Sequence, residues 1–316
     1  MRIAYICTDL GIPVFGQKGC SIHVQEVIRA LRHQGATVEL FALRCEGTPP
    51  ADFADLKVHA LPPIPKGNPK EREEKAIALN DRLHTLLSDQ PPFDLIYERY
   101  SLWSCSAMEF ALQAGIPGLL EVNAPLIEEQ LQYRELYYPQ RAEEISARAF
   151  LSAQQVIAVS QDIKNYLSLW VLPSKVHVIP NGVNHHRFEK KIKPAVILKF
   201  ESQVESQSPF TVGFVGSLRP WHGLIHLVNA FVLLRQREPE SRLLIIGDGP
   251  EREKIETLIA NKALEQAVHL TGAVSPEEIP TWLTTMDAAV APYPANIECY
   301  FSPLKVGEYM AAGLPV

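Results

Sequence analysis

The sequence predicts an α/β protein made of two Rossmann-like, doubly wound domains. Short apolar runs of the length of buried strands alternate with stretches whose apolar residues follow helical spacing. This alternation restarts after a polar segment in the middle of the chain, so the second half repeats the architecture of the first. A chain of 316 residues exceeds one typical hydrophobic core, and its 47% of hydrophobic residues indicates a globular protein.

Seven apolar runs in the first half predict buried parallel strands. They are Ile3–Cys7, Val38–Leu43, Val58–Leu61, Leu95–Glu98, Gly118–Val122, Val156–Ser160 and Val176–Pro180. Amphipathic helices are expected between them: one with the apolar stripe Val24, Val27, Ile28 and Leu31 that ends at Gly35, one at Lys70–Asp89, and a long stretch at Ile127–Gln154 that breaks near Pro139. These elements define a first domain over residues 1–183.

The second half repeats the pattern after a polar segment, residues 184–209, which we interpret as a linker. The expected strands are Phe210–Gly216, Arg242–Gly247, Val268–Thr271 and Ala288–Tyr293, and the expected helices are Leu224–Gln236, Pro250–Ala260 and Pro276–Met286. Ser275 to Glu278 is a capping box that would start the last of these helices. Residues 210–316 form the second domain, which we expect to be incomplete because Leu314–Val316 looks like the start of another strand.

Charge and cysteine content exclude several classes of protein. The net charge of −6, the pI near 6.0 and the lack of a basic run argue against binding to nucleic acid. The five cysteines are scattered, without a Cys-x-x-Cys pair, as in a reduced cytoplasmic protein. The apolar N-terminal run is too short for a signal peptide, and no stretch approaches the roughly 18 residues of a membrane span. We therefore expect a cytoplasmic protein, with peripheral contact to the inner face of a membrane left open.

The C-terminal segment carries the clearest binding motif. Ser302 is a suitable N-cap and Pro303 suits the first position of a helix. The amides of Leu304 and Lys305 would then be free at a positive helix end, beside a cation, and such an end binds phosphate. Glu308 lies about one turn later and could accept hydrogen bonds from a sugar diol. The alternative is that Lys305 and Glu308 form a surface ion pair.

Six motifs occur in a specific order and spacing along nearly the whole chain. They are Gly16–Gly19, Val159–Ser160, Ile179–Val183, Phe214–Leu218, Ile246–Pro250, and Ser302–Lys305 followed by Glu308. In this combination the chain resembles the retaining glycosyltransferases of the family-4 type, also called group 1, which have the GT-B fold of two facing Rossmann-like domains. The resemblance implies a donor site for a nucleotide-sugar in the second domain, an acceptor site in the first, and transfer without a metal ion. The absence of any Asp-x-Asp pair agrees with the last point.

The chain departs from the family pattern at three positions of the second domain, and in the first domain Glu121–Pro125 stands where the family often carries a histidine near the donor sugar. The first of two glutamates that the family usually has is replaced by Tyr300. The arginine and lysine that usually neutralise the diphosphate correspond to Ser217 and His222, and we expect Arg219 to supply the charge from a shifted position. His222 would help only when it is protonated. Arg219 could instead be a surface charge beside a packing residue, Trp221.

Three further candidates come from loops of the first domain. The amides of the loop from Gly16 to Gly19 would approach the donor phosphate and the acceptor, although a Gly-x-x-Gly sequence can also be a simple turn. His23 would contact the acceptor or take its proton, although a single histidine is more often structural. Asn181 is expected near a cleft between the domains, although Asn-Gly also marks an ordinary turn.

We therefore predict a glycosyltransferase that uses a UDP- or GDP-sugar as co-substrate and needs no other cofactor. The acceptor would be a sugar, a lipid-linked molecule or another small molecule. Its catalytic set would be Arg219, Lys305, Glu308 and His23. The main alternative is a non-catalytic remnant that binds a nucleotide-sugar, motivated by the expected missing end. An epimerase or phosphorylase of similar fold is less favoured, because neither extra carboxylates near the sugar nor a lysine-bound cofactor site can be identified.

Overall fold

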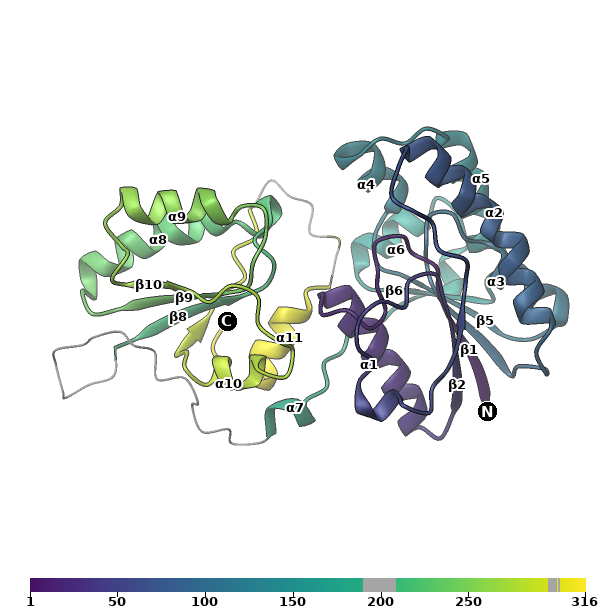
Figure 1. Cartoon of the computed structure of the whole chain (residues 1–316), viewed down its shortest axis with the longest axis horizontal. Helices are drawn as coiled ribbons and strands as arrows, with labels where there is room; N and C mark the ends of the chain where they lie inside the picture. Colours follow the sequence, from purple (N-terminus) through teal and green to yellow (C-terminus); the bar gives the residue numbers. More distant parts are fainter. Residues whose placement is uncertain (190–208, 295–299, 301) are drawn as a thin grey trace. The chain divides into compact units, whose positions relative to one another are not determined.

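The structure is a computed structural model that describes residues 1–189, 209–294, 300 and 302–316. It divides into two compact units, each with one parallel sheet (Figure 1). The first unit comprises Met1–Asn181 with Tyr300–Ser302, and the second comprises Gly182–Cys299 with Pro303–Val316. Of the predicted linker, residues 190–208 lie outside the described part, and residues 184–189 belong to the second unit. The predicted α/β class with two Rossmann-like sheets is confirmed.

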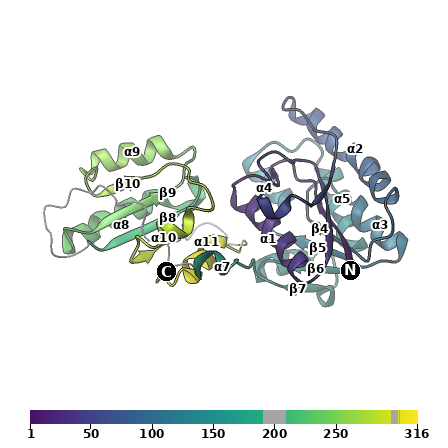
Figure 2. The same ribbon diagram turned by 60° about the horizontal axis from the view of Figure 1, so that its bottom comes forward.

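The first unit has a seven-stranded sheet in the order β3-β2-β1-β4-β5-β6-β7. Its strands are β1 (Arg2–Cys7), β2 (Thr37–Ala42), β3 (Lys57–Ala60), β4 (Leu95–Arg99), β5 (Gly118–Val122), β6 (Gln155–Ala158) and β7 (Val176–Val178). Every neighbouring pair is parallel, and Figure 2 shows β4 to β7 side by side. The order reverses between β1 and β4, which is the switch point where doubly wound folds bind ligands.

Helices cover both faces of this sheet. They are α1 (Gly19–His33), α2 (Pro69–Ser88), α3 (Ser106–Ala114), α4 (Leu126–Tyr133), α5 (Pro139–Ser152) and α6 (Gln161–Leu167). Side chains alternate along β1, so Ile3 and Tyr5 pack with α1 whereas Ala4 and Ile6 pack on the opposite core with α2, α3 and α5. The predicted break near Pro139 is confirmed. The sequence did not predict α3 or α6.

The second unit has a four-stranded sheet in the order β10-β9-β8-β11. Its elements are α7 (His186–Glu189), β8 (Thr211–Val215), α8 (Leu224–Arg237), β9 (Arg242–Ile246), α9 (Arg252–Asn261), β10 (Val268–Leu270), α10 (Ile279–Leu283), β11 (Ala288–Ala289) and α11 (Leu304–Ala311). Phe214, Leu243 and Ile245 face α8 and α9, while Leu244 and Ile246 face α10 and α11. Two cores therefore flank one sheet, as in the first unit.

Three local predictions in the second unit are wrong. The helix expected from Pro276 begins at Ile279, and residues 276–278 form turns. The Glu278 carboxylate still accepts hydrogen bonds from the amide and hydroxyl of Ser275 (3.0 and 2.7 Å), and the first of these is one of the two bonds of a capping box. The strand expected over Ala288–Tyr293 is only two residues long. Residues 314–316 form no strand, although the carbonyl of Pro315 accepts the amide of Ala289 (2.9 Å).

The structure also bears on membrane spans and on the state of the cysteines. Within the described residues, no helix is both long enough and apolar enough to cross a membrane. The four cysteines that the structure describes, Cys7, Cys20, Cys45 and Cys105, all carry free thiols, whereas Cys299 lies outside the described part.

Candidate functional site

The contact of helix α11 with strand β8 positions the candidate site of the second unit. The amide of Val215, at the last position of β8, donates to the hydroxyl oxygen of Tyr309 on α11 (2.7 Å), and Tyr309 is fully buried. Gly216 follows with φ of 150°, a conformation that other residues rarely adopt. A side chain there would place its Cβ 3.0 Å from the Nζ of Lys305. The start of α11 therefore lies directly at the carboxyl end of β8.

Among the described residues, no carboxylate lies at hydrogen-bond distance from the buried Nζ of Lys305. Its Nζ is shielded from solvent and has no hydrogen-bond partner in the part of the chain that the structure describes. It lies 4.3 Å from the ring centroid of Phe214 and 5.3 Å from that of Tyr293, so two aromatic faces surround it. Burial lowers the pKa of Lys305 to about 7, against the opposing effect of the Glu308 charge. An anion that entered here would supply the missing partner.

Free backbone amides lie beside this ammonium. The amide of Val306 donates to the carbonyl of Pro303 (3.1 Å), whereas the amides of Leu304 and Lys305 have no partner among the described residues. The predicted N-cap at Ser302 is wrong: Pro303 occupies that position, and no side chain caps the helix. The reason is that the Ser302 hydroxyl instead accepts the amide of Asn181 (3.0 Å). The positive helix end and the lysine are nonetheless adjacent, as an anion site requires.

His222, which was expected to help only when protonated, is uncharged near pH 7. Burial, and then the nearby charge of Lys305, lower the pKa of His222 to about 4, so the ring is neutral near pH 7. Its Nδ1–H donates to the carbonyl of Ser217 (2.5 Å), which leaves Nε2 as a hydrogen-bond acceptor. Ser217 itself is exposed, and its carbonyl also accepts the amide of Arg219 (3.0 Å). His222 therefore holds the loop and adds no charge to it.

Arg219 is half-buried in the same loop. Its guanidinium lies 5.6 Å from the ring centroid of Trp221, which is 37% exposed. The structure gives Arg219 no ion pair within residues 1–189, 209–294, 300 and 302–316. Stacking on Trp221 can orient the guanidinium plane while leaving its donors available to an anion.

Glu308 has a different partner from the one that the sequence suggested. Its Oε1 lies 3.4 Å from Nη1 of Arg187, which comes from α7 more than a hundred residues earlier. Both side chains are mostly buried, with exposed fractions of 18% and 19%. The surface ion pair between Lys305 and Glu308 is therefore not formed, and the carboxylate pairs with Arg187.

Asn181, Tyr300 and Ser302, which were predicted to bind the nucleotide, belong to the first unit. The amide and side-chain nitrogen of Asn181 donate to the hydroxyl and carbonyl of Ser302, each at 3.0 Å. The carbonyl of Tyr300 accepts the hydroxyl of Ser160, and the hydroxyl of Tyr300 donates to Glu129. Glu129 is half-buried on α4. These bonds tie Tyr300 and Ser302 to other residues of the first unit.

His23 belongs to a buried polar cluster that the sequence did not reveal. The ring is 6% exposed, and its Nε2 lies 2.7 Å from Oε1 of Glu121. The same carboxylate accepts Tyr97 (2.5 Å), Arg99 (3.2 Å) and the side chain of Asn123. Burial opposes its charge, but the hydrogen bonds and charges of His23 and Arg99 lower the pKa of Glu121 to about 2.

The loop between β1 and α1 is compact. The amide of Gly16 donates to the carbonyl of Pro13 (2.9 Å), and a Cβ on Gly16 would lie 2.8 Å from that proline ring. Gly19 is the first residue of α1, whose N-cap, Lys18, makes no side-chain capping bond. The hydroxyl of Ser21, one turn further on, is buried without a partner among the described residues. The predicted approach of Gly16 and Gly19 to a ligand stays a prediction.

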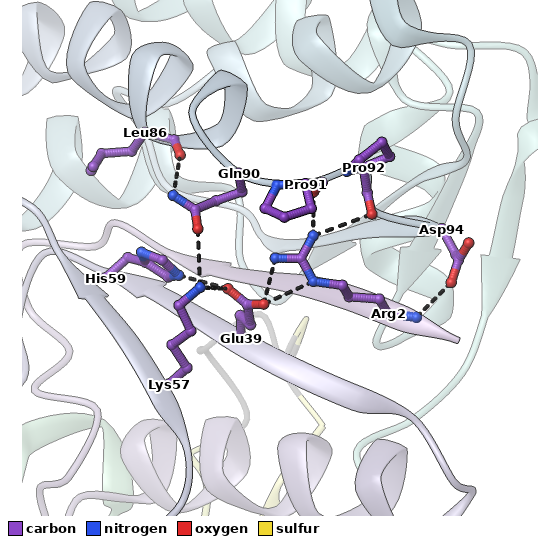
Figure 3. A network of polar contacts seen from close by, with 9 residues as sticks. All are labelled: Arg2, Glu39, Lys57, His59, Leu86, Gln90, Pro91, Pro92 and Asp94. Atoms are coloured by element: carbon purple, nitrogen blue, oxygen red, sulfur yellow. Dashed lines mark hydrogen bonds and ion pairs between the residues drawn. The ribbon is translucent and has the colours of Figure 1, made fainter.

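A second buried carboxylate lies toward the amino end of the first sheet (Figure 3). Glu39 on β2 accepts the guanidinium of Arg2 (2.5 Å), His59 (2.7 Å) and Lys57 (3.0 Å). Figure 3 shows that Arg2 also reaches the carbonyls of Pro91 and Pro92, just before β4. Burial opposes ionisation, but these partners lower the pKa of Glu39 to about 2. The network joins β1, β2 and β3 away from the strand ends where ligands bind.

One group of side chains is spaced to hold a metal ion. The ligand atoms of His185, His186 and Glu189 lie within 4.8 Å of one another, and all three side chains are exposed. Glu189 pairs with both rings, at 3.4 and 3.0 Å. The sequence analysis did not single out this group.

The networks that sequence reasoning missed share one property. Glu121 lies 98 residues from His23, and Glu308 lies 121 residues from Arg187. No local spacing reveals such pairs, because they depend on strand order. A weak signal exists for Glu121 and Arg99: each is a charged residue within an apolar strand, and buried charges need partners.

Family models match both halves of the chain. A model described as Glycosyltransferase Family 4 matches residues 18–187, and a model described as Glycosyl transferases group 1 matches residues 209–316. The chain is 24% identical over 289 residues to a D-inositol 3-phosphate glycosyltransferase of Pseudarthrobacter chlorophenolicus, a match that covers 87% of this chain and 68% of that one. Among four curated relatives, the matched segments span only 30% to 70% of the relatives' own length.

Solved structures show the same fold. Sucrose-phosphate synthase from Thermosynechococcus elongatus superposes with a TM-score of 0.72 at 19% identity, and the match covers 100% of this chain and 80% of that one. HepE from Anabaena in complex with UDP gives a TM-score of 0.67 at 19% identity, with the same coverage.

Proposed function

The chain belongs to glycosyltransferase family 4, and on this premise we propose that it transfers a sugar from a nucleoside-diphosphate donor to an acceptor hydroxyl. We propose further that the anomeric configuration is retained and that no metal ion is needed. The donor would be a UDP- or GDP-sugar bound by the second unit. The acceptor, a sugar, lipid-linked or other small molecule, would be bound by the first.

The ammonium of Lys305, which has no hydrogen-bond partner among the described residues, is the observation that carries the proposal. A buried cation without a counter-ion costs free energy, so an anion that binds beside it recovers part of that cost. The free amides of Leu304 and Lys305 point to the same kind of ligand, an anion with several oxygens. A diphosphate satisfies both features at once.

The reaction places its greatest electrostatic demand at this site. When the bond from the anomeric carbon to the phosphate oxygen breaks, negative charge builds on the leaving diphosphate and positive charge on the sugar ring. Lys305 and the start of α11 would stabilise the leaving group, with Arg219 assisting from the facing loop. Preorganised donors of this kind would serve the purpose that a metal serves in other transferases.

Retention would follow from attack by the acceptor on the face that the phosphate leaves. The acceptor proton would pass to the departing phosphate oxygen, so no protein nucleophile is needed. If His23 takes part, it would act through Nδ1, because Nε2 is committed to Glu121. The amides of Gly16 and Gly19 would approach the same reacting groups from the first unit.

Glu308 would accept the hydroxyl groups of the ribose. HepE has been solved with UDP and with UDP-glucose, which supports a nucleoside-diphosphate sugar as the class of donor. We therefore expect one nucleotide to be selected from a panel of UDP-, GDP- and ADP-sugars.

The test compares Lys305→Met with Lys254→Met in the full chain. Lys254 is an exposed lysine on α9 of the same unit, 67% exposed and paired with Glu251, so it is a matched control. Saturation-transfer NMR with the panel should identify one nucleotide, and Lys305→Met should weaken its binding about a hundredfold, as expected for a charge-assisted contact. Lys254→Met should bind like the wild type.

Two outcomes would change the proposal. If Lys305→Met binds the nucleotide as tightly as the wild type, the phosphate assignment is wrong. If the wild type binds selectively but transfers no sugar to any acceptor offered, the non-catalytic alternative is favoured.

A further inference from the structure

We propose that Arg187 is a positioning residue for nucleotide recognition, and that it acts by holding the Glu308 carboxylate in the orientation that accepts the ribose hydroxyls. The inference rests on the proposed function, because it concerns the same donor site. It assigns a role to a residue of the short helix α7, which is not part of the six motifs described above.

The guanidinium of Arg187 is anchored at two points. Its Nη1 lies 3.4 Å from Oε1 of Glu308, and its Nη2 donates to the carbonyl of Pro276 (2.6 Å). The carbonyl belongs to the turn that precedes α10, so one planar group links this turn to α11. Two directed bonds on one rigid fork fix its plane, and thereby the position of the carboxylate that it contacts.

The segment around Arg187 is itself packed on the second unit. The ring of Phe188 lies 5.6 Å from the Arg187 guanidinium and packs against the core that includes Tyr309 of α11. Val183 lies against α11 at Gly307, where an added Cβ would be 3.5 Å from its Cγ1. The contacts of Phe188 and Val183 therefore fix the backbone around Arg187 against the second unit. A movement of Arg187 away from Glu308 would disturb these contacts.

A carboxylate can keep this ion pair and still bind a ribose. Two carboxylate oxygens offer about four acceptor positions, so Glu308 can accept Arg187 and both hydroxyls of a diol. A carboxylate that is already ordered loses less side-chain freedom when the nucleotide binds. Arg187 should therefore raise affinity only for nucleotides that carry the hydroxyls which Glu308 accepts.

The experiment measures binding of UDP and GDP, and of their 2′,3′-dideoxy analogues, by isothermal titration calorimetry. The full chain is compared with Arg187→Met, Arg187→Lys, Glu308→Gln and the double variant Arg187→Met/Glu308→Gln. Arg187→Met should weaken binding of the selected ribonucleotide about tenfold, and leave binding of its dideoxy analogue within about twofold. The double variant should bind like Glu308→Gln alone, and Arg187→Lys should recover part of the loss.

Three results would overturn the inference. One is an equal loss for ribose and dideoxyribose nucleotides in Arg187→Met, since that indicates a general effect on the fold. Additive losses in the double variant would show that the two residues act independently. If the wild type binds a nucleotide and its dideoxy analogue equally tightly, Glu308 does not recognise the ribose hydroxyls, and Arg187 cannot act through it. A wild type that binds neither UDP nor GDP contradicts the proposed function itself, which distinguishes the two failures.

Discussion

The buried carboxylate of Glu121 in the first unit and the buried ammonium of Lys305 in the second lie at the carboxyl ends of parallel strands, but they differ in their partners. Glu121 accepts hydrogen bonds from His23, Tyr97 and Arg99, so its charge is neutralised inside the fold. Lys305 faces two aromatic rings and, in the described chain, no hydrogen-bond acceptor. Removing one member of a paired set of buried charges leaves another charge uncompensated, whereas a buried charge that is already unpaired costs stability and is suited to a ligand.

The largest expected effect is a loss of stability when the cluster of Glu121, His23, Tyr97 and Arg99 is broken. Glu121→Gln keeps the shape of the side chain but leaves the positive charge of Arg99 buried without its counter-ion. We expect the free energy of unfolding to fall by about 3–5 kcal/mol, the usual loss when one partner of a buried pair is removed. Urea denaturation followed by circular dichroism measures this, and a change below about 1 kcal/mol would contradict this description of the cluster.

Substitution of Lys305 should change the stability of the chain in the opposite direction. Lys305→Met removes a desolvated charge while keeping an unbranched chain against Phe214. Without nucleotide present, we expect the free energy of unfolding at pH 7 to rise by about 2 kcal/mol. Urea denaturation again gives the value, with Lys254→Met as the control. A loss of stability in Lys305→Met would mean that the ammonium already has a partner within the folded chain.

The pH dependence of stability sharpens the same contrast. The pKa of Lys305 is lowered from 10.5 to about 7 in the folded chain, so between these values the unfolded chain binds more protons. Stability should therefore rise as the pH increases from about 7 towards 10.5, by at most about 1.4 kcal/mol per pH unit for one proton. The measurement is the difference between wild type and Lys305→Met in urea at pH 7, 8 and 9. A difference that does not narrow as the pH rises would contradict the assignment.

Much of the fold could be predicted because it depends on local pattern. Each strand of both sheets was expected from an apolar run such as Ile3–Cys7, and the break at Pro139 followed from the geometry of proline. The phosphate motif at Lys305 was equally local, since a helix start and a lysine are adjacent in the sequence. The helices α3 and α6 were missed because they are short, nine and seven residues long.

The rest of the site could not be predicted because it depends on long-range pairing. Glu121 and His23 meet only after β5 and α1 have packed on the same sheet, and Arg187 reaches Glu308 across most of the second unit's sequence. The neutral state of His222 required knowledge of its burial beside Lys305. Ser302 is an adequate N-cap by residue type, but tertiary bonds to Asn181 take its polar groups.

A smaller effect is expected at Glu39, another buried carboxylate of the first unit. Its partner Arg2 keeps the carbonyls of Pro91 and Pro92, and Lys57 is 54% exposed, so Glu39→Gln leaves less charge uncompensated than Glu121→Gln. We expect a loss of about 1 kcal/mol in the free energy of unfolding and unchanged nucleotide affinity. Parallel denaturation and calorimetry check both. A loss as large as that of Glu121→Gln would show that position in the sheet does not distinguish the two clusters.

The smallest effect is expected at Arg219. Its guanidinium is half-buried and stacked on Trp221, where water screens its charge more than that of Lys305. Arg219→Ala should weaken nucleotide binding about threefold to fivefold, measured by calorimetry at low and high salt. A loss as large as that of Lys305→Met would make Arg219 an equal partner in holding the phosphates.

The most direct test of the central claim is to count the protons taken up when a nucleoside diphosphate binds. Calorimetry at pH 8, in two buffers of different ionisation enthalpy, gives this number for the nucleotide selected from UDP, GDP and ADP. Because the pKa of Lys305 is about 7 without ligand, the wild type should take up about 0.9 proton, and Lys305→Met none. Binding without proton uptake, or equal uptake in both proteins, would contradict the claim that the diphosphate is the missing partner of this ammonium.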